Sequence, residues 1–327
     1  MKVLVTGANG FVGSHILDAL RERHVSVRIL LRHTSDTSFI KRHLNDVEIH
    51  YGSLSDPESL ADGVDGVQAI IHCAGKTKVV RTEQYYEVNQ KGTANLVEVT
   101  NRQIDPIDQF IHISSRSVLG PSRSNNPATE KDLPRPISDY GKSKLLAERE
   151  VTEKCKVPWT VLRPSAVYGP RDTDFFHAFK TVHNRLMPLF DGGTQQINLI
   201  YGPDLADAVL ECLGEADAFT EIYNVASPHI STSRGLLEEI ARQMNVQPLV
   251  FSVPSKFLYP ACAIQEFLSN ITGKPSIFSR QKYHELQASG WVCSIDKIRR
   301  ELGYVAETTL SEGVAKTLRW YEEHGWL

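Results

Sequence analysis

Three glycines near the start of the chain constrain its fold more than any other feature. Residues 3–5 form a short apolar run typical of a buried parallel strand, and residues 14–20 have the spacing of a helix. Between them, Gly7 permits a tight turn, Gly10 lets the backbone approach a pyrophosphate, and Gly13 lets the helix pack on the strand. The helix N-terminus offers free N–H groups and a positive dipole end to phosphates. This strand, loop and helix predict a dinucleotide-binding domain.

Strand and helix patterns alternate along the residues that follow. Apolar runs predict strands at 2–6, 26–31, 47–50, 68–72, 109–113 and 159–162, with a later strand near 221–225. Helical patterns begin near Phe11, Asp56, Gly92 and Tyr140. Such alternation is typical of an α/β fold with a doubly wound parallel sheet of the Rossmann type.

After Pro170 the alternation loosens, and we expect a smaller, mostly helical C-terminal lobe that binds the substrate. The expected domains are a dinucleotide-binding domain at 1–170, with returning segments near 195–227 and 310–327, and a substrate-binding lobe at 171–194 and 228–309.

Two segments leave alternatives open. The loop at 121–137 is rich in Pro, Ser and Asn, and it is either a substrate flap or a plain surface connection. The lobe carries apolar side chains that either roof a substrate pocket or form ordinary core, with core favoured: Phe257, Leu258, Tyr259, Phe267 and Phe278.

Tyr140 and Lys144 lie four residues apart in a predicted helix, so their side chains stack one turn apart on one face. A free tyrosine titrates near pH ~10, and an adjacent ammonium brings that pKa toward neutral pH. The strand at 109–113 delivers Ser114 and Ser115 to its carboxyl end, where open α/β sheets bind ligands. A serine there shares a substrate oxygen with Tyr140. Together these elements predict an acid/base site beside a nicotinamide.

The chain resembles the extended short-chain dehydrogenases/reductases, also called the NAD-dependent epimerase/dehydratase family. The resemblance covers nearly the whole length and rests on six motifs in the right order. They are Thr6-Gly7-x-x-Gly10-Phe11-x-Gly13, Ile71-His72-Cys73-Ala74-Gly75, Val88-Asn89-x-x-Gly92-Thr93, Ser114-Ser115-x-x-Val118-x-Gly120, Tyr140-x-x-x-Lys144 and Leu162-Arg163-Pro164-x-x-Val167-Tyr168-Gly169-Pro170.

The resemblance implies that Ser115, Tyr140 and Lys144 form a catalytic triad, with Asn89 bracing the central strands beside the cofactor. In such enzymes the tyrosine gives or takes the proton of a substrate hydroxyl while hydride moves to or from the nicotinamide. The residues expected to bind the cofactor lie at the ends of the strands and on the catalytic helix: Gly7, Asn9, Gly10, Phe11, Val12, Gly13, Arg32, Ser53, Leu54, Cys73, Ala74, Gly75, Asn89, Tyr140, Lys144, Pro164 and Val167.

Departures from the family pattern bear on the substrate. Many members have an Asp after the glycine of strand three, where this chain has Ser53, so adenine contact falls to Ser53 and the Leu54 backbone. Dehydratases carry an Asp-Glu pair where Arg116-Ser117 stands here, which argues against elimination. Pro164-Ser165-Ala166 replaces the Asn with which many sugar-nucleotide enzymes bind a diphosphate. In this respect the chain is similar to dihydroflavonol reductases and 3β-hydroxysteroid dehydrogenases.

Three functions remain open from the sequence. The first is an NAD(P)-dependent oxidoreductase that interconverts a secondary alcohol and a ketone. The second is a nucleotide-sugar epimerase with a retained NAD, in which Lys76, Lys78 or Arg171 serves a diphosphate. The third is a non-catalytic dinucleotide sensor, against which the intact Ser115, Tyr140 and Lys144 count.

The choice between NADP and NAD depends on the end of the second strand. An acidic residue there would bind the ribose 2′-hydroxyl, but Arg32 stands at this position and suits a 2′-phosphate, with Thr34 and Ser35 as neutral donors nearby. We therefore expect NADP in preference to NAD. Asp36 offers an alternative acceptor for the NAD ribose.

The net charge of −3, from 36 basic and 39 acidic side chains, is too balanced to suggest nucleic-acid or bulk membrane binding. We expect a small-molecule substrate as partner and leave a homodimer open. Five scattered cysteines, without a C-x-x-C pair, fit free thiols in a reducing cytoplasm. The histidines make no metal-ligand spacing, and we expect His72 and His112 to be hydrogen-bonded core residues.

Overall fold

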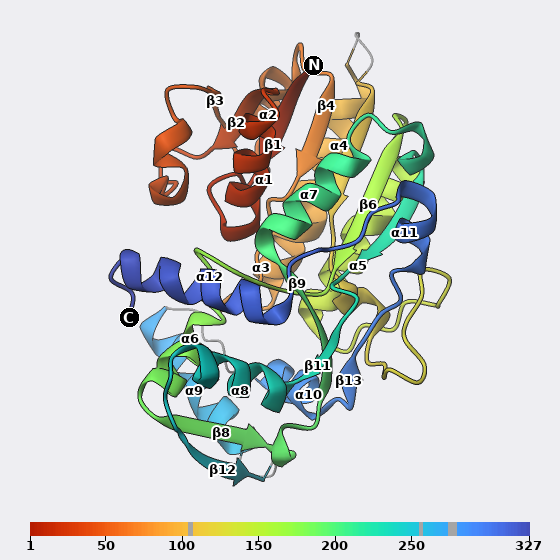
Figure 1. Cartoon of the computed structure of the whole chain (residues 1–327). Helices are drawn as coiled ribbons and strands as arrows, with labels where there is room; N and C mark the ends of the chain where they lie inside the picture. The colour runs from red at the N-terminus through yellow and green to blue at the C-terminus, as the bar shows by residue number, and fades with distance from the viewer. Residues whose placement is uncertain (104–106, 255–257, 274–279) are drawn as a thin grey trace.

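The computed structural model describes residues 1–103, 107–254, 258–273 and 280–327. Its centre is a sheet of seven strands in the order β10-β6-β5-β4-β1-β2-β3, and every neighbouring pair is parallel (Figure 1). The strands are β1 (Lys2–Thr6), β2 (Ser26–Leu31), β3 (Glu48–Tyr51), β4 (Ala69–His72), β5 (Gln109–Ile113), β6 (Trp159–Pro164) and β10 (Glu221–Val225). The predicted Rossmann-type sheet is confirmed, with strand boundaries displaced by at most two residues.

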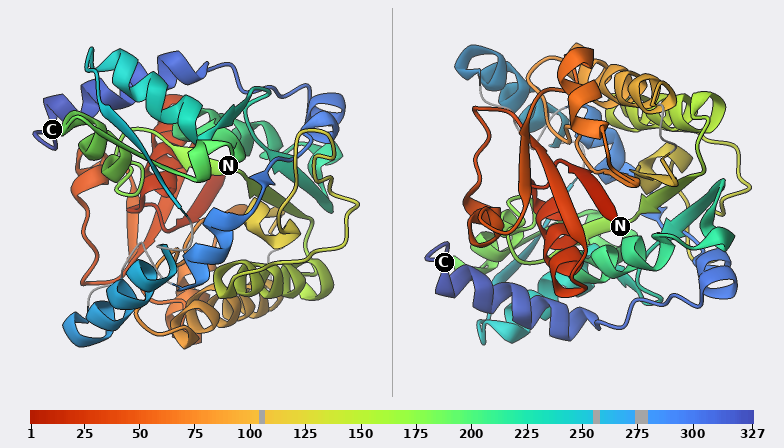
Figure 2. Two further views of the ribbon diagram at one scale, coloured as in Figure 1. Left: turned by 90° about the horizontal axis from the view of Figure 1, so that it is seen from below. Right: turned by 90° about the horizontal axis from the view of Figure 1, so that it is seen from above.

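Helices cover both faces of this sheet (Figure 2). One face packs against α1 (Phe11–Glu22), α7 (Gly202–Cys212) and α11 (Asp296–Leu302), and the other against α2 (Pro57–Val64), α4 (Gly92–Asn101) and α5 (Asp139–Lys154). Val3 and Val5 enter the first core and Leu4 the second, because successive side chains of a strand point to opposite faces. A short helix α3 (Glu83–Tyr85) and a π-helical turn (Tyr86–Lys91) lead into α4.

The smaller lobe lies beyond the carboxyl ends of the parallel strands (Figure 1). Its helices are α6 (Phe176–His183), α8 (Ser233–Gln243), α9 (Leu258–Thr272) and α10 (Arg280–Gln287). Beside these helices it has two small sheets. One is built from β7 (Ala166–Tyr168), β9 (Gln196–Tyr201), β11 (Ile230–Thr232) and β13 (Gly290–Trp291), and the other from β8 (Leu186–Phe190) and β12 (Leu249–Val253).

The last helix, α12 (Leu310–Glu323), differs from the expectation that it returns to the main domain. Its buried side chains Val314, Leu318 and Tyr321 join the core of the smaller lobe, together with Phe179. Their spacing of four and three residues forms one apolar stripe, and that stripe is covered by α6 and α8. Contact with the main domain is made through Trp320, whose ring meets Phe39 edge to face.

The loop at 121–137 is fastened to the smaller lobe rather than free to swing. Ser122 and Ala128 form isolated parallel bridges with Trp291 and Cys293. The Ala128 N–H donates to the Val292 carbonyl at 3.0 Å, and the Ser294 N–H donates to the Ala128 carbonyl at 2.9 Å. These contacts favour the plain connection over the flap.

Of the apolar set expected in the lobe, the backbone of Phe257 and Phe278 and the side chains of Leu258 and Phe267 lie outside the described residues. Tyr259 is described, and it is 44% exposed, so it belongs to neither a roof nor a closed core. No helix in the described part of the chain has the length and apolarity to cross a bilayer.

Candidate active site

The glycine loop has the geometry that a dinucleotide diphosphate requires. Gly7 has a positive φ of 74°, and a Cβ there would lie 2.7 Å from Ala74 backbone atoms. A Cβ on Gly13 would lie 2.0 Å from the Gly7 carbonyl oxygen, so only glycine lets α1 start this close to the loop. The cap residue Gly10 brings no side chain to α1, which leaves the N–H groups of the first turn for a ligand.

The residues that follow β4 form a wall beside the glycine loop. The N–H of Cys73 donates to the Thr6 carbonyl at 3.2 Å, and the N–H of Ala74 donates to the Thr6 hydroxyl at 3.3 Å. Burial raises the pKa of the Cys73 thiol to about 11, so this side chain is neutral and packs rather than reacts. Cys73, Ala74 and Gly75 therefore lie directly beside the glycine loop.

Asn89 ties this wall to α5. Its Oδ1 accepts from the Lys76 N–H at 2.7 Å, and its Nδ2 donates to the Lys76 carbonyl at 3.1 Å and to Ser143 Oγ at 2.9 Å. All of these contacts are made from a buried position inside the π-helical turn. Asn89 therefore holds the loop after β4 against α5, whereas the expected brace was between the central strands.

Tyr140 reaches Ser115 because two local devices bring α5 against the end of β5. Ser138 caps α5 by accepting from the Gly141 N–H at 3.2 Å. Gly141 then packs on the turn that follows Ser115, at residues 116–119, where a Cβ on Gly141 would lie 2.9 Å from the Ser117 carbonyl oxygen. The Tyr140 hydroxyl shares a hydrogen bond with Ser115, whose Oγ also accepts from Ser117 Oγ at 2.9 Å. The role of Gly141 is visible in the sequence only as the residue after the tyrosine.

The two titratable groups of the site are buried together. Lys144 is 5% exposed, and its Nζ donates to the Ile113 carbonyl at 2.7 Å. Burial lowers the pKa of Lys144 to about 8, while Cys73 and Glu148 oppose that shift. Burial raises the pKa of Tyr140 to about 12, while the hydrogen bond with Ser115 lowers it, so the expected shift toward neutral pH is not found. At neutral pH the tyrosine is therefore a proton donor and the lysine carries its charge.

This arrangement predicts an alkaline limit to ketone reduction. Below about pH 8 Lys144 is an ammonium, the form in which the expected triad would stabilise developing negative charge at the Tyr140 hydroxyl, and above it that charge is lost. We expect kcat/KM for reduction to be flat below pH 8 and to fall tenfold per pH unit above it. Lys142→Met, a change on the exposed side of α5, should leave this profile unmoved. The same alkaline limb in Lys144→Met would contradict the assignment.

A buried ion pair lies beside Ser114, the residue before Ser115. Arg163 Nε and Nη2 donate to the two carboxylate oxygens of Glu148 at 2.9 and 2.7 Å, and the two residues are 3% and 2% exposed. Ser114 Oγ donates to the same carboxylate. This pair links β5, α5 and β6, and the sequence analysis gave it no role.

Tyr85 is a further neighbour of Tyr140, and it was not predicted from the sequence. Its ring lies 5.9 Å from the ring of Tyr140, and its hydroxyl donates to the Thr77 carbonyl at 3.1 Å. Burial, followed by the electrostatic effect of Tyr140, raises the pKa of its hydroxyl. The only sequence signal was its place four residues before Asn89, one helical turn away.

The basic residues suggested for a diphosphate are already engaged. Arg171 donates to Ser14 Oγ at 3.0 Å and pairs with Asp18 at 2.7 Å. Lys78 pairs with Asp174. Lys76 contributes its backbone to Asn89, as described above. Two of the three cations proposed for the epimerase are thus neutralised by carboxylates.

Arg116, at the position where the resemblance places a dehydratase acid, is bound to the smaller lobe. Its Nη1 donates to the Gly120 carbonyl at 2.7 Å and its Nη2 to the Val292 carbonyl at 3.1 Å. The guanidinium lies 5.1 Å from the centre of the Trp291 ring. Arg116 therefore holds the turn at residues 116–119 against the smaller lobe.

The two strand histidines differ from each other. His72 bonds Thr6 Oγ1 at 2.7 Å and Thr93 Oγ1 at 2.9 Å, as expected of a core histidine. The expectation is wrong for His112, whose two ring nitrogens are buried without a hydrogen-bond partner. The ring of its β4 neighbour His72 lies 5.3 Å away, and burial keeps the pKa of His112 well below the ordinary value.

At the adenosine end, Arg32 is exposed just after β2, and its N–H donates to Ser35 Oγ at 3.0 Å. Among the described residues, none pairs with its guanidinium. The Asp36 carboxylate accepts from the Ser38 N–H at 2.9 Å, and the Asp36 carbonyl accepts from Asn9 Nδ2 at 2.9 Å. Arg32 is thus the residue free to meet a phosphate.

Ser53 and Leu54 follow β3 beside this segment. The Ser53 N–H donates to Ser59 Oγ at 3.1 Å, and the Leu54 carbonyl accepts from Asn95 Nδ2 at 2.7 Å. Pro164 is buried at the end of β6 and Val167 is half-buried in β7. The expected cofactor residues therefore line the carboxyl-end edge of the sheet from β3 to β6.

The chain belongs to the NAD dependent epimerase/dehydratase family, whose model matches residues 3–226. It is an NAD(P)-dependent enzyme of the extended short-chain dehydrogenase type, with both reductases and epimerases among its relatives.

Two relatives illustrate this range. A ceramide reductase from Caulobacter vibrioides is 26% identical over 327 residues, which is 99% of this chain and 96% of that protein. An N-acetyl-alpha-D-glucosaminyl-diphospho-ditrans,octacis-undecaprenol 4-epimerase from Escherichia coli O157:H7 is 26% identical over 344 residues, which is 98% of this chain and 96% of that protein. Among solved structures, the UDP-glucose 4-epimerase of Thermus thermophilus in complex with NAD has a TM-score of 0.78 at 23% identity, covering 98% and 99% of the two chains.

Proposed function

We propose that this protein is an NADP(H)-preferring reductase that interconverts a ketone and a secondary alcohol lacking a nucleotide diphosphate. The observation that carries the proposal is the hydrogen bond between Tyr140 and Ser115 beside the buried Lys144, at the same sheet edge as the glycine loop. That constellation supports proton transfer to a substrate oxygen.

In this proposal each side chain has one task. The dinucleotide supplies or accepts hydride at the substrate carbon. Tyr140 donates its hydroxyl proton to the carbonyl oxygen, and Ser115 hydrogen-bonds the same oxygen and fixes its position. Lys144 stabilises the negative charge that develops on the Tyr140 oxygen. Asn89 holds α5 against the loop that follows β4.

The preference for a substrate without a diphosphate follows from the charges at the substrate side. Arg171 and Lys78 are paired with Asp18 and Asp174. A diphosphate would have to break these pairs, since it needs cations of its own. Ser165 in place of an amide side chain supports the same preference. The lipid portions named for the ceramide and undecaprenol relatives support a largely apolar substrate here.

An epimerase with a retained NAD is the second candidate, favoured by the similarity to the undecaprenol-linked epimerase. Denaturing protein purified without added cofactor, and identifying any released dinucleotide by absorbance and mass, separates the two. We expect little bound dinucleotide and tighter uptake of NADPH than of NADH. A stoichiometric NAD, released only on unfolding, would favour the epimerase.

Arg32→Asp tests the cofactor preference separately. An aspartate at the end of β2 would repel a 2′-phosphate and accept from a 2′-hydroxyl. We expect the ratio of NADPH to NADH affinity to fall by at least tenfold, measured by fluorescence titration. Arg28→Gln, on the same strand but bonded to Glu48, is a control that should leave the ratio within twofold. An unchanged ratio in Arg32→Asp would remove the phosphate argument.

The same proposal assigns residues 1–170 to dinucleotide binding and residues 171–194 and 228–309 to substrate binding, in a cytoplasmic enzyme with free thiols.

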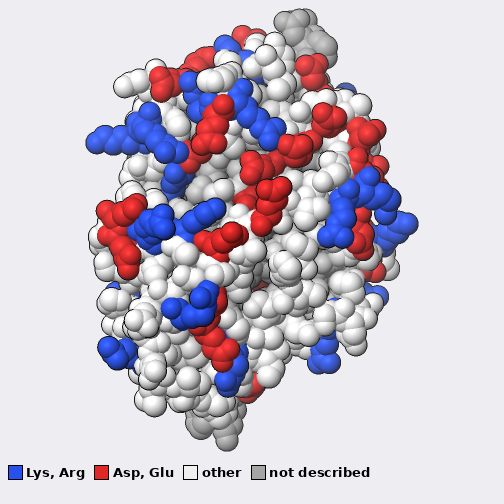
Figure 3. Space-filling model, viewed as in Figure 1, with Lys and Arg blue, Asp and Glu red and all other residues white. Residues whose placement is uncertain are grey.

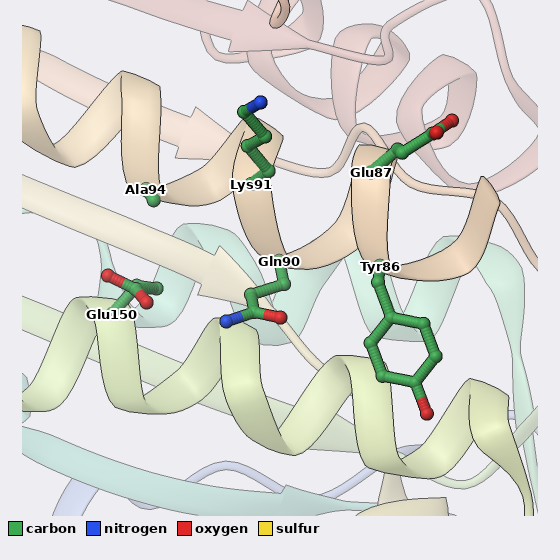
Figure 4. A pocket seen from close by; sticks show the side chains of 6 residues that line it. All are labelled: Tyr86, Glu87, Gln90, Lys91, Ala94 and Glu150. Carbon is green, nitrogen blue, oxygen red and sulfur yellow. The ribbon is translucent and has the colours of Figure 1, made fainter. Parts of the chain in front are cut away.

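We also propose a homodimer through α4 and α5. These helices and the π-helical turn form a groove of about 360 Å³, lined by Tyr86, Glu87, Gln90, Lys91, Ala94 and Glu150 (Figure 4). Such a groove offers apolar surface with a polar rim for a second copy. Sedimentation velocity would test the dimer.

A further inference from the structure

Ser117 lies two residues after Ser115, and the proposed function gives it no task. It donates twice to the same atom, because its N–H bonds Ser115 Oγ at 3.2 Å and its hydroxyl bonds Ser115 Oγ at 2.9 Å. The first bond is the usual cap of a short helical turn, here at residues 116–119. The second is a separate contact between side chains, and both serines are half-buried at the edge of the reaction centre.

The two bonds from Ser117 decide how Ser115 can bond any further partner. A serine hydroxyl has one hydrogen to donate and two lone pairs with which to accept. Both lone pairs of Ser115 Oγ are occupied by Ser117, so toward a third group Ser115 can act only as a donor. In the hydrogen bond that Ser115 shares with Tyr140, the acceptor is therefore the Tyr140 oxygen. This leaves the Tyr140 proton for a substrate.

The turn that carries Ser117 is fixed by packing. Gly141 of α5 lies directly against it, since a Cβ on Gly141 would lie 2.9 Å from the Ser117 carbonyl oxygen. Val118 and Leu119, which follow in the same turn, are buried. Ser117 is thus held in place relative to Tyr140 on α5 before a substrate arrives, and such preorganisation favours a defined hydrogen-bond direction.

Charged side chains on the molecular surface are mixed in sign. On the face shown in Figure 3, basic and acidic side chains of the described residues lie beside one another, so this face has no broad field of one sign to steer an anionic substrate. At the substrate side, Arg171 and Lys78 are paired with carboxylates. An uncharged substrate fits this distribution, and the group to be recognised at the reaction centre is then its reacting oxygen.

We propose that Ser117 is a positioning residue that makes Ser115 a dedicated hydrogen-bond donor toward the reacting oxygen. A ketone oxygen can accept from Tyr140 and from Ser115 at once, and both bonds strengthen as negative charge develops on it. Tyr140 transfers its proton to that oxygen and keeps the electron pair, whereas Ser115 transfers no proton. The catalytic consequence rests on the proposed function, but the direction of the hydrogen bonds does not.

Neutron diffraction from crystals of the unaltered chain in D₂O tests the direction without any substrate. We expect the hydroxyl deuterium of Ser117 to point at Ser115 Oγ, and the hydroxyl deuterium of Ser115 to point at the Tyr140 oxygen. A Ser115 deuterium directed at Ser117 would overturn the proposal, as would a Ser117 deuterium directed away from Ser115.

Ser117→Ala tests the catalytic consequence. The variant keeps the N–H cap of the turn but frees one lone pair of Ser115, so Tyr140 can donate its proton to Ser115 instead of to the substrate. We expect kcat for ketone reduction to fall about tenfold, with the melting temperature and the NADPH affinity unchanged. The probe is whichever of cyclohexanone, acetophenone and 2-decanone the unaltered chain reduces fastest.

Two further variants separate the hydroxyl from the packing of the turn. Ser117→Thr retains both donors and should restore kcat to within twofold of the unaltered chain. Ser124→Ala is the matched control, since Ser124 is exposed in the loop at 121–137 and its hydroxyl donates to Gln196 Oε1 at 3.0 Å. It should also stay within twofold.

An unchanged kcat in Ser117→Ala would overturn the proposed role of Ser117, and so would equal losses in Ser117→Ala and Ser117→Thr. If the neutron map shows the expected directions but the unaltered chain reduces none of the three ketones, the result counts against the proposed function, and the assignment of Ser115 as a donor stands.

Discussion

Tyr140→Phe should lower kcat for ketone reduction by about a thousandfold while leaving NADPH affinity unchanged. The substitution removes one oxygen, and general acid catalysis by a positioned side chain contributes roughly 10²–10⁴-fold. Phenylalanine preserves the ring that packs against Tyr85, so the helix and the glycine loop should keep their geometry. The measurements are steady-state turnover and a fluorescence titration with NADPH.

The matched control is Tyr86→Phe. The Tyr86 hydroxyl donates to the Asp139 carboxylate at 2.8 Å. The substitution therefore removes the same atom from a tyrosine that does not hydrogen-bond Ser115. We expect its kcat to stay within twofold. Full turnover in Tyr140→Phe would mean that the proton comes from another group, and the proposed roles of Ser115 and Lys144 would fall with it.

The parts of the fold that were predictable are those set by local pattern. Strand and helix periodicity located the seven strands of the main sheet, because the central strands β1, β4, β5 and β6 are largely apolar runs buried on both faces. The edge strand β3 is less apolar and has no buried residue. Glycine spacing located the loop, because a Cβ at Gly7 or Gly13 would collide with neighbouring backbone. Both signals lie within a few residues of sequence and need no knowledge of tertiary contacts.

The parts that were missed depend on partners far apart in the chain. Glu148 and Arg163 read as a surface helix residue and a strand residue, and only the fold places them in one buried pair. His112 looked like its hydrogen-bonded neighbour His72, but a strand pattern does not state whether a hydroxyl faces the ring. The segment of α12 was expected to pack on the main domain, but its apolar stripe is buried in the core of the smaller lobe.

Cofactor and substrate preferences were predicted only in part from the sequence. The sequence placed Arg32 at the end of β2, and the structure adds that one oxygen of the nearby Asp36 carboxylate accepts from the Ser38 N–H. The sequence also named Arg171 and Lys78 as cations for a diphosphate, and the structure adds their carboxylate partners. In both cases residue type suggested a ligand, and the structure adds the partners that the charged groups already have.

Arg163→Met should destabilise the protein by about 3–5 kcal/mol, because it leaves the Glu148 carboxylate buried without a cation. Glu148→Met should cost a comparable amount, since it leaves the guanidinium alone and removes the acceptor of Ser114. Urea unfolding of each variant, at equal m-value, measures both costs.

The double variant Glu148→Met/Arg163→Met should recover much of this loss, because two apolar side chains of similar length carry no charge to desolvate. The expected coupling energy is at least ~2 kcal/mol. The exposed pair Glu98–Arg102 is the control, and its loss should cost under ~0.5 kcal/mol. Additive single effects would contradict a coupled buried pair. A double variant that regains stability but not kcat would show that the pair positions Ser115 through Ser114, beyond its effect on folding.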